Sequence, residues 1–231
     1  MIPSEIYAWR KGERARLLKE RQALTEDVLS EFRARIDGHL ERAFADLAHG
    51  IVAFCWPYKN EYDARHLAAS LRRRGAVTAL PVVVAPKSPL IFREWHPGVA
   101  MSSGPLGIPY PAASNEVRPD HVLLPMLGWD GDGYRLGYGG GFFDRTLAAI
   151  EKRPRVIGVS YESAYLRTIH PQPHDIPMDF VVTERGVHRR EPQGLKFLDN
   201  PQAFSSPPCY AGEIAPGYFG EEPKTPDTPR R

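Results

Sequence analysis

Short apolar runs that alternate with helix-like segments restrict the fold of this chain more than any other feature of its sequence. Such runs, several of them closed by proline or glycine, are typical of buried strands. Between them, residues 63–75 and 142–153 carry apolar side chains with a helical period. Strands joined by helices need crossover connections, which predict an α/β fold with a mainly parallel sheet covered on both faces. The predicted strands are 51–57, 77–84, 90–95, 121–127, 156–161 and 179–184.

Two details refine this prediction. Residues 3–46 repeat apolar side chains at spacings of mostly three and four, which predicts helix. Thr25, followed by Glu26 and Asp27, has the chemistry of an N-cap, so we expect the segment to break into two helices there. The run 90–95 is more amphipathic than the other strands, and we expect it at an edge of the sheet or in a hairpin.

The composition changes near residue 200. Residues 1–200 are predicted to form a single α/β domain, and residues 201–231 a separate tail. The tail holds seven prolines and few aliphatic residues. It cannot build a core, so we expect it to be extended or disordered. Its segment 209–220 carries three aromatic side chains, which could dock on the domain or on a partner.

Charge and hydropathy exclude several classes of protein. Lys and Arg number 30 and Asp and Glu 28, a formal net charge of +2, so a strongly basic nucleic-acid coat is excluded. No apolar run approaches the roughly 18 residues of a membrane span, and the N-terminal segment lacks the apolar stretch of a signal peptide. Two cysteines are too few for a disulfide scaffold. We therefore expect a cytoplasmic protein without nucleic-acid or membrane partners.

A glycine-rich segment, residues 129–150, carries the strongest functional signal. Five glycines fall between positions 133 and 141, just before a predicted helix. Glycine lets backbone N–H groups approach an anion, and the first turn of a helix adds unpaired N–H groups. Arg135 and Arg145 can donate to phosphate, and Asp144 is a suitable oxygen ligand for Mg²⁺. The segment predicts a phosphate cradle; a tight turn without a ligand is the alternative.

The sequence of this loop points to a family. Its glycines match neither GxxxxGK[ST] nor GxGxxG, but RLGYGGGFFDR (135–145) closely resembles the signature loop of the 5-formyltetrahydrofolate cyclo-ligases. Other segments follow in the family's order, so that the resemblance covers about residues 8–185. These segments are the basic helix 10–21, FCWPYKNE (54–61), LPVV (80–83), GPLGIPYP (104–111), LLPMLGWD (123–130) and PQPHDIPMDFVVTE (171–184).

The resemblance implies a three-layer α/β/α fold and a ligase that converts 5-formyltetrahydrofolate to 5,10-methenyltetrahydrofolate. ATP and Mg²⁺ are the implied cofactors, and ADP and phosphate the other products. The implied mechanism is phosphoryl transfer from ATP to the N5-formyl oxygen, followed by attack of N10 on the activated carbon and loss of phosphate. Such a reaction depends on positioning and charge stabilisation more than on covalent catalysis. The resemblance also suggests a monomer.

The resemblance assigns ATP to the first helix and the glycine loop. Arg10 and Arg14, one helical turn apart, match a basic pair of the family. The family residue at position 10 is usually lysine, so Lys11 is a second candidate, and the residues alone would suggest only a solvated basic face. Arg135 and Tyr138 are the implied catalytic side chains. The implied ATP-binding loop is Arg135, Leu136, Gly137, Tyr138, Gly139, Gly140, Gly141, Phe142 and Phe143.

The resemblance also assigns Mg²⁺ to Asp144 and Asp175, and the folate to Glu61 and Trp56. A carboxylate can accept from two N–H donors of a pterin, and an aromatic side chain can stack on its face. From the residues alone, Asp175 could equally form a turn and Trp56 could be a core residue. The family position of Leu106 is commonly aromatic, which leaves the fit of the folate open.

Two other functions are compatible with the sequence. One is an ATP-binding paralogue that has lost folate cyclisation, and the departures at positions 10 and 106 leave room for it. The other is a non-catalytic binding module whose tail recruits a partner. An assay of cyclisation separates the ligase from the other two, because only the ligase forms the methenyl product. A shift of the melting temperature on ATP binding then separates the paralogue from the binding module.

Overall fold

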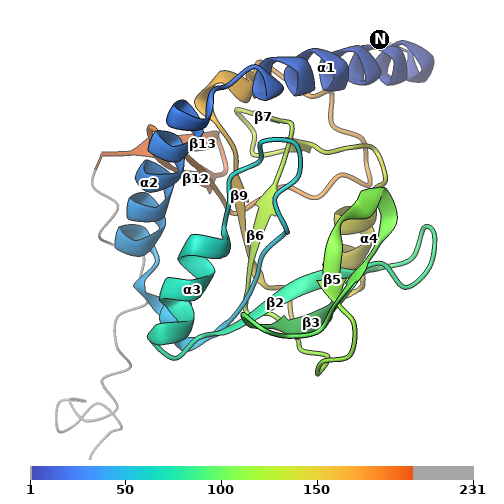
Figure 1. Cartoon of the computed structure of the whole chain (residues 1–231). Coiled ribbons are helices and arrows are strands. Elements are labelled where there is room, and N and C mark those ends of the chain that lie inside the picture. The colour runs from blue at the N-terminus through green and yellow to red at the C-terminus, as the bar shows by residue number, and fades with distance from the viewer. Residues whose placement is uncertain (1, 200–231) are drawn as a thin grey trace, which may run out of the picture.

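An eight-stranded sheet forms the centre of the computed structural model, which describes residues 2–199 (Figure 1). The strand order is β13-β12-β11-β9-β6-β1-β2-β3. The strands from β11 to β2 are parallel to their neighbours, and the outer strands on both sides pair antiparallel. The parallel strands are β1 (Ile51–Ala53), β2 (Val77–Val82), β6 (His121–Pro125), β9 (Arg155–Val159) and β11 (Phe180–Thr183); the outer ones are β3 (Ile91–Trp95), β12 (Gly186–Glu191) and β13 (Gly194–Leu198).

Helices cover both faces of this sheet, which confirms the predicted three-layer arrangement (Figure 1). On one face lie α2 (Glu26–Ala43), the short 3₁₀ helix η1 (Ala45–His49) and α3 (Arg65–Arg73). On the other lies α4 (Phe142–Ala149), with the long helix α1 (Pro3–Gln22) running across one end of the sheet. The predicted break between the first two helices is confirmed, since the Thr25 side chain accepts from the backbone N–H of Val28 as an N-cap.

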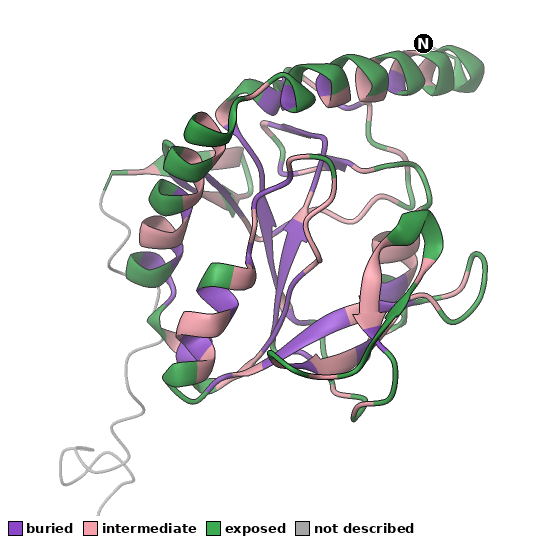
Figure 2. Ribbon diagram, in the orientation of Figure 1, coloured by how far each residue is buried: buried purple, intermediate pink, exposed green. Residues whose placement is uncertain are grey.

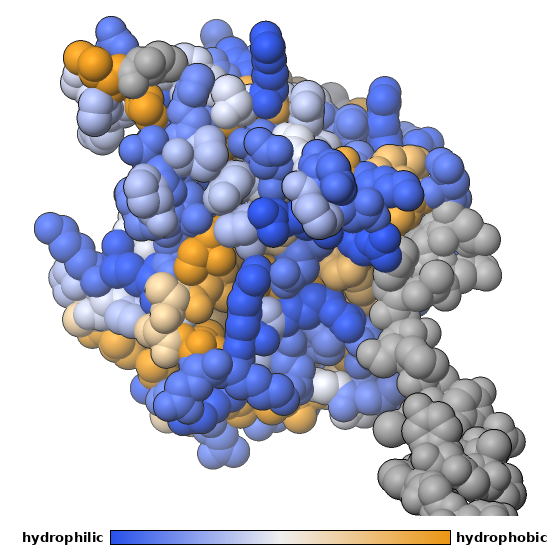
Figure 3. All heavy atoms as spheres, turned by 180° about the vertical axis from the view of Figure 1, so that it is seen from behind, coloured by the Kyte–Doolittle hydropathy of each residue, from blue (hydrophilic) through white to orange (hydrophobic). Residues whose placement is uncertain are grey.

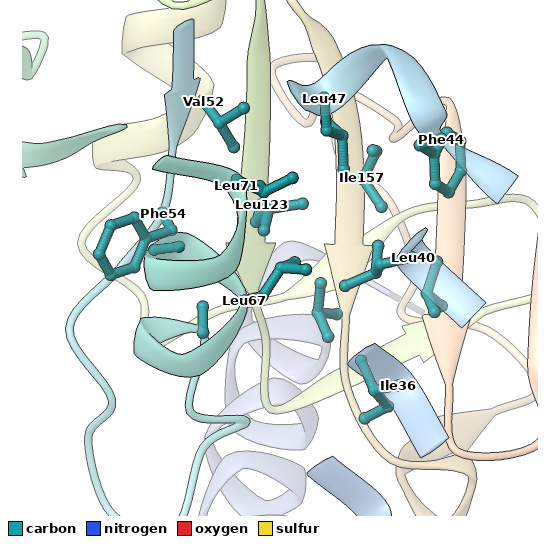
Figure 4. Packing of buried hydrophobic residues seen from close by; sticks show 14 of the residues in the cluster. Ile36, Leu40, Phe44, Leu47, Val52, Phe54, Leu67, Leu71, Leu123 and Ile157 are labelled. Atoms are coloured by element: carbon teal, nitrogen blue, oxygen red, sulfur yellow. The ribbon is translucent and has the colours of Figure 1, made fainter. Parts of the chain in front are cut away.

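The side chains of the parallel strands alternate between two apolar cores, one on each face of the sheet. Val52, Leu123 and Ile157 point to the α2 and α3 side, and their neighbours Ala53, Val122 and Val156 to the other. The central strands are accordingly buried along most of their length (Figure 2). Figure 4 shows the first core, where the strands meet the side chains of Ile36, Leu40, Phe44, Leu47, Leu67 and Leu71.

The structure corrects the predicted strand lengths. The expected strand 51–57 ends at Ala53, and 121–127 ends at Pro125. Proline has no N–H to donate, so β6 leaves the ladder at Pro125. The segment of β1 leaves it after the hydrogen bond from the Phe54 N–H to the Ala79 carbonyl oxygen, before Pro57 is reached. The run 90–95 is confirmed as the edge strand β3. The hairpin of β12 and β13 was not predicted. Its strands carry polar residues, as exposed strands at a sheet edge do, and they lack the apolar run that indicates a buried strand.

Several small elements complete the described part of the chain. One hairpin joins β4 (Met101–Ser103) and β5 (Pro109–Pro111), with the 3₁₀ turn η2 (Pro105–Gly107) at its tip. A second sheet, which was also not predicted, contains β7 (Gly128–Asp130), β8 (Arg135–Leu136) and β10 (Tyr165–Leu166), the last preceded by η3 (Glu162–Ala164). The predicted tail, 201–231, lies outside the described residues.

The surface is mostly polar. Seen from the side opposite to Figure 1, hydrophilic residues cover most of the face, with smaller apolar areas between them (Figure 3). Across residues 2–199, every helix is either too short or too polar to cross a lipid bilayer.

We predict that Val52→Ala destabilises the domain whereas Val84→Ala does not. Val52 is 1% exposed in β1, and Val84 is 55% exposed beyond β2. Both substitutions remove two methyl groups, but only Val52→Ala leaves a cavity in the core. That cavity should lower the free energy of unfolding by about 2 kcal/mol. For a domain of this size that corresponds to a fall in melting temperature of about 4–8 °C. Equal melting temperatures in calorimetry would contradict the assigned core.

Candidate functional site

The candidate site is a cavity at the point where the strand order of the sheet reverses. From β1 the chain crosses to β2 on one side, and later returns to place β6 on the other side of β1. A crevice opens outside the carboxyl ends of the strands at such a switch point, and α/β proteins commonly bind ligands there. The cavity holds about 470 Å³. Its floor comes from the strand ends: Cys55 and Trp56 after β1, Leu80, Pro81 and Val83 at the end of β2, and Leu124 and Pro125 at the end of β6.

The glycine loop forms one wall of this cavity. It leaves the β7–β8 hairpin at Gly137 and ends where α4 begins, with Gly141 as the N-cap. Gly139 and Gly141 have φ values of +92° and +62°, a region that side chains disfavour, so the sharp course of the loop depends on glycine. Gly137 has open space where a Cβ would stand. The loop therefore presents bare backbone to the cavity beside the N-terminus of a helix, as an anion site requires.

Four arginines surround the loop, and two of them are paired with the candidate metal ligands. Arg10 forms a buried ion pair with Asp175, and Arg135 donates to Asp144 at 2.6 Å. Arg10 also donates to the carbonyl oxygens of Ile169 and His170, which anchors the segment that carries Asp175. Asp144 accepts in addition from the backbone N–H of Ile176 at 3.1 Å. Both carboxylates are thus positioned beside the loop by ion pairs from α1 and β8.

The other two arginines leave the loop with excess positive charge. Arg14 donates to the Gly137 carbonyl oxygen at 2.7 Å, and Arg145 donates to that of Gly140. Within residues 2–199, Arg14 has no carboxylate within ion-pair distance. Burial, and next the neighbouring Arg10, lower the pKa of Arg14. An anion in the cavity would relieve both effects, so the electrostatics favour a phosphate-bearing ligand.

A buried carboxylate also lines the cavity, beside the Tyr138 side chain of the loop. Glu61 accepts from the Tyr138 hydroxyl at 3.0 Å and from the backbone N–H of Tyr58 at 3.1 Å. Arg21, in the last turn of α1, lies 3.8 Å from the same carboxylate and also donates to the Tyr138 hydroxyl. The residue is only 8% exposed. Burial raises the pKa of Glu61, and the charge of Arg21 and the Tyr138 hydroxyl oppose that rise without cancelling it.

Aromatic and apolar groups line the space next to Glu61. Trp56 is half-buried in the cavity wall, with its ring edge-on to Trp95 and the Arg65 guanidinium 4.8 Å above it. Leu106, at the tip of the β4–β5 hairpin, reaches the cavity while 68% exposed, and its φ is +61°. A flat ring system could contact Trp56 and Leu106 with its apolar surface. N–H groups at the edge of the ring could donate to Glu61.

Comparison with known proteins identifies the family. The profile of the 5-formyltetrahydrofolate cyclo-ligase family matches residues 6–184. The chain belongs to this family. It is 31% identical over 183 residues to the 5-formyltetrahydrofolate cyclo-ligase of Mycolicibacterium smegmatis, covering 75% of this chain and 93% of the relative, and 31% identical over 149 residues to that of Escherichia coli K12, covering 61% and 81%.

Solved structures agree on the fold of this cyclo-ligase family member. The structure of a 5,10-methenyltetrahydrofolate synthetase from Aquifex aeolicus superposes with a TM-score of 0.69 at 24% identity, over 82% of this chain and 97% of that one. One from Mycoplasma pneumoniae gives a TM-score of 0.63 at 22% identity, over 76% and 98%. At these identities the likeness establishes the shared fold.

Most of the predicted site residues meet in this one cavity. Its lining includes Arg10, Arg14, Trp56, Glu61, Asp144, Asp175 and all of 135–143. Lys11, the second candidate beside Arg10, is exposed and does not line the cavity, since it lies on another side of α1. Trp56 both lines the cavity and packs against the core, so the two readings of it are compatible.

Arg21 was not predicted from the sequence as a site residue. Positions 10, 14 and 21, with the buried Leu17 between them, fall within a narrow sector of α1 at 100° per residue. Arg10 and Arg21 are buried there, and Arg14 contacts the glycine loop. That periodicity is present in the sequence. It was not recognised because buried arginines break the apolar pattern that marks the inner face of a helix.

We predict that Glu61→Gln makes this protein more stable at neutral pH. Folding raises the pKa of Glu61, so the folded state prefers the protonated form, and stability falls as pH rises from the ordinary Glu value towards the raised one. Glutamine mimics the protonated side chain. The variant should melt above the wild type at pH 7, with a difference that shrinks towards pH 4.

The exposed Glu151→Gln substitution is the control and should show no such trend. A Glu61→Gln variant that melts below the wild type at pH 7 would mean that the carboxylate stabilises the fold.

Proposed function

We propose that this protein catalyses the ATP- and Mg²⁺-dependent cyclisation of 5-formyltetrahydrofolate to 5,10-methenyltetrahydrofolate, with release of ADP and phosphate. One observation carries the proposal. A single cavity at the switch point of the sheet is lined by a glycine loop with arginines around it and, next to that loop, by a buried carboxylate with an aromatic wall. The two halves suit the two substrates, a polyphosphate and a pterin, and membership of the cyclo-ligase family supports this reading.

The glycine loop is the proposed site for the triphosphate. Arg14, and the backbone of Gly137 to Gly141, would bind the phosphate oxygens, with Arg10 and Arg135 held beside them by their aspartate partners. ATP supplies the phosphoryl group that makes the formyl oxygen a good leaving group. Arg135 is then placed to stabilise the negative charge that develops on that group, and Tyr138 to position the reacting formyl group, so these remain the proposed catalytic side chains.

Asp144 and Asp175 are the proposed Mg²⁺ ligands. Their oxygens lie at one side of the cavity, and each keeps only a small exposed fraction, 19% and 11% of the side chain. Within residues 2–199 there is no cluster of three His, Cys, Asp or Glu side chains that could hold a metal alone. Two carboxylates suit Mg²⁺, which completes its octahedron with water and phosphate oxygens.

Glu61 and Trp56 are the proposed folate contacts. The carboxylate would accept from the N–H groups of the pterin, and Trp56 would contact its ring. Leu106 takes the place of the usual aromatic residue at the mouth of the cavity and would supply an apolar but not a stacking contact.

We further propose that the enzyme acts as a monomer, as its resemblance to the family suggests. Within residues 2–199 the Cys55 thiol in the cavity wall forms no disulfide, which suits a reducing compartment, and we propose the cytoplasm.

The proposal is tested by mixing the full chain with 5-formyltetrahydrofolate and Mg-ATP and recording the near-ultraviolet absorbance of the conjugated methenyl product. Absorbance should rise only when ATP is present. If ATP raises the melting temperature but no product forms, the protein is an ATP-binding paralogue. If neither ligand shifts the melting temperature, the cavity binds neither substrate and the proposal fails.

We predict that Glu61→Gln raises the KM for 5-formyltetrahydrofolate about ten- to hundredfold, because a charge-assisted contact worth about 1.5–3 kcal/mol is lost. The KM for ATP is the internal control and should change little. A similar rise in both constants would place Glu61 in the scaffold of the cavity rather than against the folate.

We predict that Asp144→Asn raises the Mg²⁺ concentration for half-maximal turnover about tenfold or more, because the charged ligand is lost while the side chain keeps its size. Asp179→Asn is a matched control. Asp179 likewise forms an ion pair with an arginine, Arg153, and accepts from a backbone N–H, that of Val156, but it lies outside the cavity. An unchanged Mg²⁺ dependence in Asp144→Asn would remove this residue from the metal site.

A further inference from the structure

Arg21 is a buried arginine whose contacts reach both halves of the cavity. Its side chain is 7% exposed. The guanidinium donates to the carbonyl oxygens of Lys59 at 2.9 Å, and of Tyr58 and Met126 at 3.3 Å. It also donates to the Tyr138 hydroxyl of the glycine loop. A guanidinium with five fixed donors can hold this many acceptors in one geometry, whereas an ammonium group cannot.

The turn that carries Glu61 depends on this arginine. Residues 58–61 form a tight turn, closed by a hydrogen bond from the Glu61 N–H to the Tyr58 carbonyl oxygen at 3.2 Å. Its two central residues, Lys59 and Asn60, have φ values of +49° and +59°. This conformation is disfavoured for side-chain-bearing residues and persists only where surrounding contacts hold it. Arg21 binds two carbonyl oxygens of the turn, and Asn60 Nδ2 donates back to the Arg21 carbonyl oxygen at 3.5 Å.

The same guanidinium lies beside the junction between the turn and the glycine loop. The Tyr138 hydroxyl donates to Glu61 and accepts from Arg21. The Tyr138 ring also packs edge-on against Tyr58, with centroids 5.8 Å apart. Arg21 stands on the same helix as Arg14, which binds the loop at Gly137. A conformational change in the glycine loop is therefore transmitted to the Glu61 carboxylate through the Tyr138 hydroxyl and the Arg21 guanidinium.

We propose that Arg21 is a positioning residue that couples the two ligand sites, so that occupation of the glycine loop by a nucleotide tightens binding of the pterin at Glu61, and the reverse. The inference rests on the proposed function for the identity of the two ligands. Ordering the loop fixes Tyr138, which in turn holds Glu61 in the orientation that the second ligand needs. The second ligand then binds without the cost of ordering that network.

The test measures the dissociation constant of 5-formyltetrahydrofolate with and without a non-hydrolysable ATP analogue and Mg²⁺. The wild type should bind the folate at least about fivefold more tightly when the analogue is present, and linkage requires the same factor in the reverse experiment. In Arg21→Met this factor should fall to about one, while the analogue alone still binds. In Arg21→Lys it should fall partly, because the charge is kept but the fork of donors is lost.

Arg16 provides a matched control on the same helix. It is exposed, and in the described part of the chain its ion pairs are those with Glu13 and Glu20, so Arg16→Met should leave the coupling factor unchanged. If Arg21→Met fails to fold, Tyr138→Phe replaces it. That variant removes the hydroxyl between Arg21 and Glu61 from a side chain that is 42% exposed, and it should also bring the factor close to one.

The inference is overturned if the wild type shows no coupling, or if the folded Arg21→Met or Tyr138→Phe variants couple the ligands as the wild type does. Failure of the proposed function is a different result. In that case the wild type forms no methenyl product from 5-formyltetrahydrofolate and Mg-ATP, whatever its binding constants are.

Discussion

The geometry of the site depends on the hydrogen bonds that the arginine side chains of α1 donate to surrounding oxygen atoms. A buried arginine stays charged and carries five donors, so it must be surrounded by oxygen atoms. Arg10, Arg14 and Arg21 find them on backbone carbonyl groups of the segments around the cavity: Ile169 and His170, Gly137, and Tyr58, Lys59 and Met126. One face of one helix therefore fixes the relative positions of loops that are far apart in the sequence.

The same arrangement shows where stability is exchanged for function. Burial raises the pKa of Glu61, although Arg21 and Tyr138 stabilise its charged form, so folding makes ionisation of this carboxyl group less favourable. Two non-glycine residues keep positive φ in the adjoining turn, and a third, Leu106, does so at the tip of the hairpin opposite. Strain and buried charge gather at the carboxyl ends of the strands, while the two apolar cores supply the stability that tolerates them.

The core of the fold was predictable because its signals are local. The runs around Val52, Val122 and Val156 are apolar on both faces, and a parallel sheet beneath helices is the arrangement that buries both. Thr25 marked a helix start by its own side chain. The β12–β13 hairpin was missed because its residues, such as Arg189 and Arg190, do not alternate in hydropathy as a half-buried strand does. The strand at 51–57 was predicted too long because an apolar run does not show where the ladder ends.

The sequence alone determined the chemistry available at the site: a glycine loop before a helix, arginines around it, and aspartates and a glutamate in segments that resemble one family. It also determined the secondary structure that needs only local periodicity and capping. The tertiary structure decided which of these groups meet. It placed Asp175 against Arg10, 165 positions away, left Lys11 outside the cavity, and brought Arg21 between Glu61 and Tyr138. Such contacts follow from the strand order and from the need of each buried charge for a partner, and neither is visible in any local stretch of the chain.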